Sequence, residues 1–291
     1  MSESVLMRGR ELDLARPVLM GIVNATPDSF SDPQGPKELD ELVARALGQI
    51  EDGAAIVDVG GESGRTDTEA VPVEEEIARV VPLVERLAAH GVLVSVDTWR
   101  GPVARAALAA GAAMINDVSG LSDESVASAC ADTGAALVIT HTRAAPKTKA
   151  FPEYDDVVSD VRGFLDERMR AAEALGVTPD QIVLDPGIDL AKSPAESIEL
   201  LRRLREFAPL GRPLLLAVSR KDFVGALTER PPAARDAGTL AAVGAAVRGG
   251  ARIIRVHDVA GARDYLRVHE ALTEGADGTL ELATELKREA V

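Results

Sequence analysis

Short runs of consecutive apolar residues alternate along this chain with longer stretches in which apolar residues recur every three or four positions. Because the short runs are continuous, they indicate strands that are covered on both faces, as in a parallel sheet. The longer stretches have the periodicity of amphipathic helices. The predicted strands are Val18–Asn24, Ala55–Gly60, Leu93–Asp97, Ala113–Asp117, Ala135–His141, Ile182–Asp185, Leu214–Ser219 and Arg252–His257.

Helical periodicity fills most of the intervals between these strands, and glycines stand where a helix should end and the next strand begin. The predicted helices are Glu38–Glu51, Glu74–Ala89, Pro102–Ala109, Val157–Leu175, Ala195–Phe207 and Thr239–Arg248, and the glycines are Gly53, Gly91, Gly111, Gly134, Gly176 and Gly250. An unbroken series of eight strand–helix units predicts a protein of the α/β class with a single (β/α)8 TIM barrel, rather than an open doubly wound sheet.

The length of the chain limits the number of domains. A (β/α)8 barrel takes about 250 residues, so a chain of 291 residues leaves little for a second domain. We assign residues 18–274 to the barrel. Residues 1–17 form an N-terminal extension, and the polar residues 275–291 form a C-terminal tail.

Composition and charge indicate which kinds of molecule the protein can bind. Only 3% of residues are aromatic, so the core must consist of Val, Leu, Ile and Ala. A net charge of −15 argues against binding to nucleic acid or to an anionic membrane and leaves small molecules as expected partners. The single Cys130 excludes an intramolecular disulfide, and no apolar run has transmembrane or signal-peptide character, so we expect a cytoplasmic protein.

Polar residues end the apolar strands, and this is the strongest indication of a site. A single Asp, Asn or Ser in such a position could be a helix N-cap, and for Ser219 and Asn24 alone the two interpretations are equally good. A whole set on one rim instead indicates a polar mouth at the carboxyl end of the barrel, where barrel enzymes place their active sites. The set is Asn24, Asp58, Asp97, Asn116, Asp117, His141, Asp185, Ser219 and His257.

The chemistry of this rim suggests its ligand. Asp97, Asn116 and Asp185 would suit a flat heterocycle with several N–H donors and ring acceptors, because buried polar groups need partners. Side chains that are positively charged or donate hydrogen bonds stand at the same end and match a substrate that carries phosphate. These side chains are Arg65, Lys221, Arg255 and His257. The sequence has neither a glycine-rich nucleotide loop after a strand nor Cys/His pairs with zinc spacing.

Seven segments in order resemble those of the dihydropteroate synthase family, from about Val18 to Leu272. They are Gly21-Ile-Val-Asn-Ala-Thr-Pro-Asp-Ser-Phe-Ser-Asp32, Val57-Asp-Val-Gly-Gly-Glu-Ser63, Ser95-Val-Asp-Thr98, Ile115-Asn-Asp117, Leu184-Asp-Pro-Gly187, Ser219-Arg-Lys221 and Ile254-Arg-Val-His-Asp258. The resemblance implies an enzyme that joins 6-hydroxymethyl-7,8-dihydropterin pyrophosphate to p-aminobenzoate and releases 7,8-dihydropteroate and pyrophosphate.

The resemblance also implies roles for residues of this chain. The pterin would be bound by Asp97, Asn116, Asp185 and Lys221, and the pyrophosphate by Asn24, Arg65, Arg255 and His257. Mg²⁺ would bridge Asn24 to phosphate oxygens. The aryl amine would lie against Gly64, Thr66, Leu190 and Ser219, and the groups closest to the chemistry would be Lys221, Arg255, His257 and Asp97. The family is typically a homodimer, for which the alanine-rich segment Ala233–Gly250 offers a face.

Departures from the family pattern gather on the aryl-amine side. The second loop, usually Glu-Ser-Thr-Arg-Pro-Gly, here reads Glu62-Ser-Gly-Arg-Thr-Asp67. In the loop after the sixth strand Leu190 replaces a Phe, and Asp189 adds a charge near the expected position of the p-aminobenzoate carboxylate. His141 is open between a structural role and a pterin contact.

Three alternatives to a true synthase remain at this stage. The first is a divergent paralogue that binds the pterin pyrophosphate but uses another amine or is inactive with p-aminobenzoate. The second is a methyltetrahydrofolate-binding methyltransferase, which would leave Arg65, Lys221, Arg255 and His257 unexplained because a methyl donor carries no pyrophosphate. The third is a pterin-binding protein without catalysis.

Overall fold

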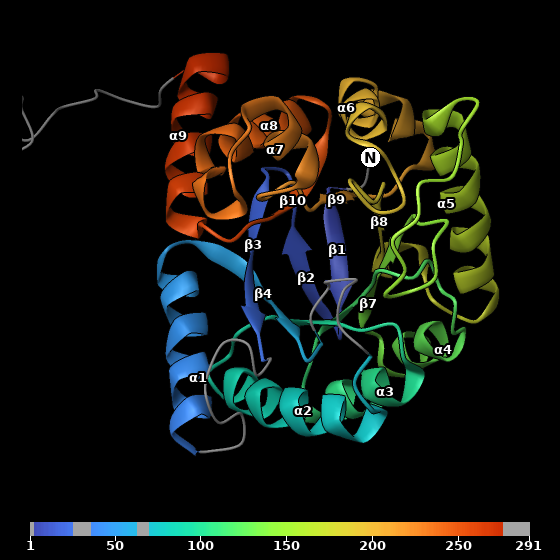
Figure 1. Cartoon of the computed structure of the whole chain (residues 1–291). Coiled ribbons are helices and arrows are strands. Elements are labelled where there is room, and N and C mark those ends of the chain that lie inside the picture. The colour runs from blue at the N-terminus through green and yellow to red at the C-terminus, as the bar shows by residue number, and fades with distance from the viewer. Residues whose placement is uncertain (1–2, 26–35, 63–69, 276–291) are drawn as a thin grey trace, which may run out of the picture.

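The computed structural model describes residues 3–25, 36–62 and 70–275. Eight parallel strands close into a barrel, and the helices of the described residues surround it (Figure 1). Around the barrel the strands run β10-β3-β4-β5-β6-β7-β8-β9, so each strand pairs with its neighbours in the chain and the last closes on the first. The predicted (β/α)8 barrel is confirmed.

The strands agree with the predicted runs in position, but three of them end earlier than predicted. They are β3 (Val18–Asn24), β4 (Ala54–Gly60), β5 (Val94–Asp97), β6 (Met114–Asp117), β7 (Ala136–Thr140), β8 (Ile182–Asp185), β9 (Leu214–Leu216) and β10 (Ala251–Arg255). His141, Ser219 and His257 therefore lie in the loops after β7, β9 and β10. After β9 and β10 the chain stays apolar at Ala217, Val218 and Val256, so there the apolar run in the sequence is longer than the strand.

The helices agree with most of the predicted stretches. They are α1 (Pro36–Glu51), α2 (Val73–Ala89), α3 (Gly101–Ala110), α4 (Ser125–Thr133), α5 (Val157–Ala174), α6 (Pro194–Arg202), α7 (Asp222–Thr228), α8 (Asp236–Arg248) and α9 (Val259–Glu274). The single helix predicted over Ala195–Phe207 is wrong. Arg203 leaves the helical region at φ −109°, and a 3-10 helix, η3 (Leu204–Leu210), follows. None of the helices described is long and apolar enough to cross a membrane.

Two apolar layers result from the alternation of side chains along each strand. One set of positions, such as Val57 and Val96, packs against the helices. The other set, such as Ile56, Met114 and Val183, fills the inside of the barrel. Two residues further along the same strands, the inner positions become polar. They are Asp58, Asn116 and Asp185.

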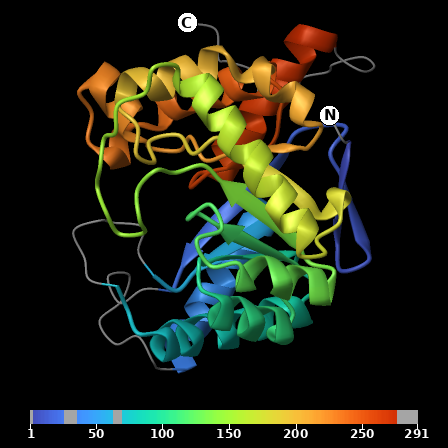
Figure 2. The same ribbon diagram turned by 90° about the vertical axis from the view of Figure 1, so that its right-hand side faces the viewer.

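A hairpin closes the amino end of the barrel. It consists of β1 (Ser4–Met7) and β2 (Arg10–Asp13) and belongs to the segment predicted as an N-terminal extension. Val5, Met7 and Leu14 are fully buried against the inner layer of the barrel. Figure 2 shows this hairpin at the end opposite to the loop between β7 and α5. The apolar inner layer and the hairpin leave the carboxyl end as the open one.

Candidate active site

An ion-paired cluster spans the inside of the barrel at its carboxyl end. The Arg255 guanidinium donates through Nε to Asp58 Oδ2 at 2.7 Å and through Nη2 to Asp97 Oδ2 at 3.3 Å. Asn116 Nδ2 donates to the same Asp58 oxygen at 3.0 Å. Asp58 is fully buried and joins β4, β6 and β10 at one point. The cluster thus fixes the orientation of three predicted site residues.

Burial shifts the protonation equilibria of this cluster. It raises the pKa of Asp97 to about 7, helped by the neighbouring Asp58 carboxylate and opposed by Arg255. Burial by itself would lower the pKa of Arg255, but Asp58 and Asp97 reverse that effect and raise it. Arg255 therefore stays charged, whereas Asp97 can hold or release a proton near neutral pH.

Buried polar atoms without a partner lie in this cluster and on the strands beside it. Within the described part of the chain, Asp58 Oδ1, Asn116 Oδ1, Ser95 Oγ and Thr140 Oγ1 have no hydrogen-bond partner. All four side chains stand on inner positions of the strands, by the alternation that places Ile56 and Met114 inside. Since an unpaired buried polar atom is costly, these atoms indicate a ligand with several N–H or O–H groups.

Asp185 and Lys221 continue the polar lining beyond β7. Asp185 Oδ1 accepts a hydrogen bond of 2.7 Å from the backbone of Gly187. Burial raises the pKa of Asp185, opposed by this bond, Lys221 and Lys192. Lys221 precedes α7, and Arg235 Nη1 donates to its carbonyl at 3.0 Å. Burial lowers the pKa of Lys221, opposed by acidic neighbours that include Asp189 and Asp185.

Ser219 and His257 form a pair on the rim. Ser219 Oγ lies 2.9 Å from His257 Nδ1, and the His257 backbone N–H donates to the same oxygen at 3.3 Å. Partial burial, helped by the cations Arg220 and Arg255, lowers the pKa of His257 to about 4. The imidazole is therefore neutral at pH 7.

Asn24 ends β3 with an exposed side chain. Gly60 leaves the space beside it open, because a Cβ at Gly60 would come within 3.3 Å of Asn24 Oδ1 and 3.9 Å of Asp97 Cβ. The described residues contain no group of three His, Cys, Asp or Glu side chains that could hold a metal ion. Asn24 thus presents an amide oxygen at the mouth.

Two residues of the predicted rim do not line the mouth. Asp117 stands on an outer position of β6 and accepts hydrogen bonds from Ser119 N at 2.7 Å, Ser119 Oγ at 2.6 Å and Leu121 N at 3.1 Å. It shapes the turn toward α4. His141 is fully buried between Lys192 and Asp160, which decides the open question in favour of a structural role. A polar residue at the end of a strand can face either way, and the alternation of faces turns Asp117 away from its neighbour Asn116.

The loop after β8 differs from expectation in one respect. The Asp189 carboxylate accepts hydrogen bonds from the backbone N–H groups of Asp222 and Phe223, the latter at 3.4 Å. Its charge therefore faces the start of α7, where backbone N–H groups favour an anion. The expected repulsion of a substrate carboxylate is correspondingly reduced. Gly64, Arg65 and Thr66 lie outside the described residues.

The fold brings to this region three polar residues that the sequence pattern does not single out, Ser95, Thr140 and Lys192, and it gives Asp58 a role beyond its predicted place on the rim. Period-two alternation backward from Asp97 on the same strand would have found Ser95. Nothing in the sequence would have revealed that Lys192 is only 1% exposed.

Comparisons with known proteins agree with this geometry. A family model described as pterin binding enzyme matches residues 20–257. Dihydropteroate synthase of Escherichia coli is 41% identical over 266 residues, which cover 91% of this chain and 94% of the relative. A structure of Xanthomonas albilineans dihydropteroate synthase with 4-aminobenzoic acid has a TM-score of 0.87 and 44% identity, and the match covers 94% of this chain and 98% of the other.

A second structure of the Xanthomonas albilineans enzyme, in complex with 7,8-dihydropteroate, has a TM-score of 0.82 and 41% identity, with 93% and 98% of the two chains covered. The family model thus spans most of the chain, and these relatives match it over nearly its full length. This chain belongs to the family of pterin-binding enzymes and, within it, to the dihydropteroate synthases.

Proposed function

We propose that this chain condenses 6-hydroxymethyl-7,8-dihydropterin pyrophosphate with p-aminobenzoate, giving 7,8-dihydropteroate and pyrophosphate. The observation that carries this proposal is the cluster in which Arg255 is held by Asp58 and Asp97 and shares Asp58 with Asn116. It places unpaired acceptors inside the barrel and a cation at the mouth, as a pterin with an anionic leaving group requires.

The pterin ring is assigned to the inner polar positions. Asn116 Oδ1 is free to accept a ring N–H, and Asp185 and Asp97 supply carboxylates on either side. Lys221 supplies a donor for the ring edge. Asp97, with a pKa of about 7, serves a ligand in which donors and acceptors alternate, because it can be matched in either protonation state.

The pyrophosphate is assigned to the rim, where Asn24, Arg65, Arg255 and His257 would surround it. The guanidinium of Arg255 is already oriented by two carboxylates, so little reorganisation is needed when the anion binds. The neutral His257 can gain a proton beside an anion, which would add a second positive charge where the leaving group departs.

Mg²⁺ is proposed as the cofactor, with Asn24 as its protein ligand. Magnesium prefers oxygen ligands and commonly takes one or two of them from the protein and the rest from phosphates and water. A single amide oxygen at the mouth fits an ion that binds together with the pyrophosphate. When bound, the ion would neutralise charge on the phosphate oxygens.

The reaction is a substitution at the methylene carbon of the pterin. The lone pair of the aryl amine forms the new C–N bond, the C–O bond breaks, and its electron pair leaves with pyrophosphate. Arg255 and a protonated His257 stabilise the departing anion, and Asp97 and Asp185 favour positive charge on the pterin. An aryl amine is nucleophilic without its proton being removed, so the site needs no strong base; the proton is lost after bond formation.

The aryl amine is assigned to the side of Leu190 and Ser219, and the family resemblance adds Gly64 and Thr66 as contacts. A related enzyme has been solved with 4-aminobenzoic acid, and another structure of it holds 7,8-dihydropteroate. Because Asp189 faces the start of α7, its charge is no strong argument against p-aminobenzoate. Leu190 in place of an aromatic residue would weaken ring packing by about 1 kcal/mol.

The proposal is tested by measuring pyrophosphate release from the pterin pyrophosphate with p-aminobenzoate and with a panel of other aryl amines. Turnover with p-aminobenzoate that saturates in both substrates is expected. Turnover only with another amine would identify a divergent paralogue, and binding of the pterin pyrophosphate without release would identify a non-catalytic protein. Methyl transfer from methyltetrahydrofolate would contradict the proposal outright.

A homodimer is proposed through the face formed by α6, α7 and α8. A groove of about 630 Å³ on this face is lined mainly by apolar residues, among them Phe223, Leu227 and Ala245, and Leu227 is 69% exposed. A second copy of the chain would cover this surface.

The compartment proposed for the protein is the cytoplasm. The free, buried Cys130 fits this compartment, which keeps thiols reduced.

A further inference from the structure

The loop after β8, residues 186–193, is held in a conformation that its sequence does not favour. Gly187, Asp189 and Ala191 all have positive φ angles, of 70°, 63° and 52°. For Asp189 and Ala191 this left-handed region is unfavourable, so contacts from outside the loop must maintain it. At Gly187 a side chain is excluded as well, because a Cβ would lie 2.0 Å from the carbonyl oxygen of His141.

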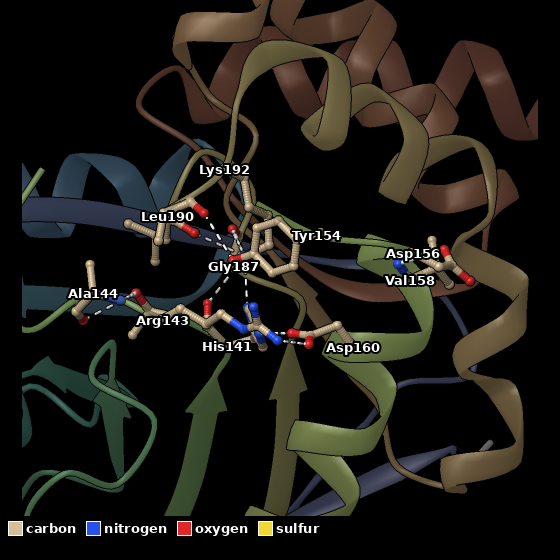
Figure 3. A network of polar contacts seen from close by, with 12 residues as sticks. His141, Arg143, Ala144, Tyr154, Asp156, Val158, Asp160, Gly187, Leu190 and Lys192 are labelled. Carbon is tan, nitrogen blue, oxygen red and sulfur yellow. Dashed lines mark hydrogen bonds and ion pairs between the residues drawn. The ribbon is translucent and has the colours of Figure 1, made fainter. Parts of the chain in front are cut away.

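Lys192 provides the central contact. Its side chain is 1% exposed, and its Nζ lies 2.8 Å from His141 Nδ1, 2.8 Å from the Gly187 carbonyl oxygen and 2.9 Å from the Leu190 carbonyl oxygen. An ammonium group has three N–H donors and no acceptor, so these three short contacts match the charged form of the side chain. Both ends of the turn are thus tied to one buried charge (Figure 3).

The loop after β7 completes the support. Because Lys192 donates to Nδ1 of His141, the other ring nitrogen carries the proton and donates to Asp160 Oδ1 at 3.3 Å. Arg143 pairs with the other oxygen of Asp160. The Tyr154 hydroxyl donates to the Ala191 carbonyl at 2.9 Å. Figure 3 shows Lys192 between the turn that carries Leu190 and the loop that carries Tyr154.

This network reaches the proposed site from two directions. Asp185 accepts the Gly187 N–H, while the Gly187 carbonyl accepts from Lys192. Asp189, two residues on, binds the start of α7 directly after Lys221. A shift of the loop would therefore displace Leu190 and Asp189 without moving the strands that carry Asp97 and Asn116.

We infer that Lys192 is a positioning residue for the aryl-amine side of the site: its buried ammonium group fixes the loop after β8 and thereby places Leu190 and Asp189. The part of this inference that names the aryl amine rests on the proposed function. Burial lowers the pKa of Lys192 to about 7, opposed by Asp185, and lowers that of His141 to about 2, helped by Lys192. A neutral His141 beside a charged Lys192 agrees with the contact geometry.

The test compares Lys192→Met with Gln181→Met. Gln181 is buried at the opposite end of β8, where its Nε2 donates to the carbonyls of Cys130 and Ala135. Both changes remove buried donors next to the same strand, so Gln181→Met controls for a general loss of stability. Lys192→Arg keeps the charge and should restore part of any loss, and Tyr154→Phe weakens the same loop with little risk to folding.

We expect Lys192→Met to raise KM for p-aminobenzoate about tenfold or more, since small displacements of binding groups have effects of this size. KM for the pterin pyrophosphate should change by less than about threefold, because its main ligands stand on strands. Tyr154→Phe should shift KM for p-aminobenzoate in the same direction by a smaller factor. An unchanged KM for p-aminobenzoate in Lys192→Met, or an equal rise in Gln181→Met, would overturn the inference.

Hydrogen exchange of peptides covering residues 186–193 gives a readout that needs no turnover. Lys192→Met should lower protection of this loop, whereas Gln181→Met should not. If Lys192→Met does not fold, the same loss is expected on a smaller scale in Tyr154→Phe. Absence of wild-type turnover would defeat the proposed function but not this measurement, and unchanged loop protection would defeat the role of Lys192 alone.

Discussion

Arg255 and Asp58 are 197 residues apart in the chain, and their side chains meet at 2.7 Å across the inside of the barrel. The carboxylate is fully buried, and the guanidinium is 18% exposed. The pair therefore has two effects. It neutralises a carboxylate that would be costly to bury without a partner, and it orients the guanidinium toward the mouth.

Replacing Asp58 with Asn should destabilise the protein strongly. Arg255 would lose its nearest counter-charge, and removing one partner of a buried ion pair typically costs about 3–5 kcal/mol. Urea unfolding measures this change. Asp264→Asn is the control, because its pair with Arg263 is largely exposed on the aspartate side and should contribute less than about 1 kcal/mol. Equal losses in the two variants would refute the special role of Asp58.

Asp97 should make stability depend on pH between about 4 and 7. Its pKa rises from the ordinary 3.8 to about 7 on folding, so the folded state holds its proton more tightly than the unfolded state over this range. Stability contributed by that proton is present at low pH and is lost as the pH rises through 7. Asp97→Asn removes this dependence.

Between pH 4 and pH 7 the free energy of unfolding of the wild type should therefore fall relative to that of Asp97→Asn. The slope is at most about 1.4 kcal/mol for each pH unit, since one proton is involved. A difference that stays constant over this range would show that the raised pKa belongs to another group.

His257 should take up a proton when the pyrophosphate binds. Its pKa is about 4 in the free protein, and an anion beside the imidazole raises it, so binding near pH 6 should consume up to about one proton. Calorimetry in buffers of different ionisation enthalpy measures the uptake. His257→Asn should abolish it and His90→Asn should not, since His90 caps α2 far from the barrel mouth. Uptake that persists in His257→Asn contradicts the assignment.

Asn116 and Asp117 are adjacent in sequence but should behave differently. Asn116→Ala should weaken binding of the pterin pyrophosphate by about tenfold or more, because a hydrogen-bonding site rejects a mismatched partner. Asp117→Ala removes three hydrogen bonds of the turn toward α4 and should cost about 1–3 kcal/mol of stability. Comparing ligand affinity and urea unfolding for both separates the roles. If Asp117→Ala weakened binding of the pterin pyrophosphate strongly and Asn116→Ala did not, the roles assigned to the two residues would be wrong.

Substitutions of Asp189 and of Leu190 should also have different effects on turnover and stability. Leu190→Phe should lower KM for p-aminobenzoate, since an aromatic neighbour adds about 1 kcal/mol of ring packing. Asp189→Gly suits the positive φ but removes the carboxylate from the start of α7, so it should cost about 1 kcal/mol of stability without raising turnover. Steady-state kinetics and thermal unfolding of the two single variants are the measurements. A gain in turnover from Asp189→Gly would show that its charge repels the substrate after all.

The sequence by itself determined the barrel and the end at which the site lies. Continuous apolar runs such as Ile182–Asp185 require cover on both faces, and a chain of eight strand–helix units has few other ways to provide it. Since parallel strands share one direction, polar residues at their carboxyl ends necessarily meet on one rim. Asp97, Asn116, Asp185 and Arg255 could be placed there from local information alone.

Only the tertiary structure decided which of these residues face one another. A polar strand end looks the same in sequence whether it points inward, as Asn116 does, or outward, as Asp117 does. The burial of Lys192, the direction of Asp189 and the pairing of Arg255 with Asp58 depend on contacts between segments distant in the chain. The physical reason is that apolar pattern is a local property of each strand, whereas the cost of a buried charge is settled only by the partners that the closed barrel brings to it.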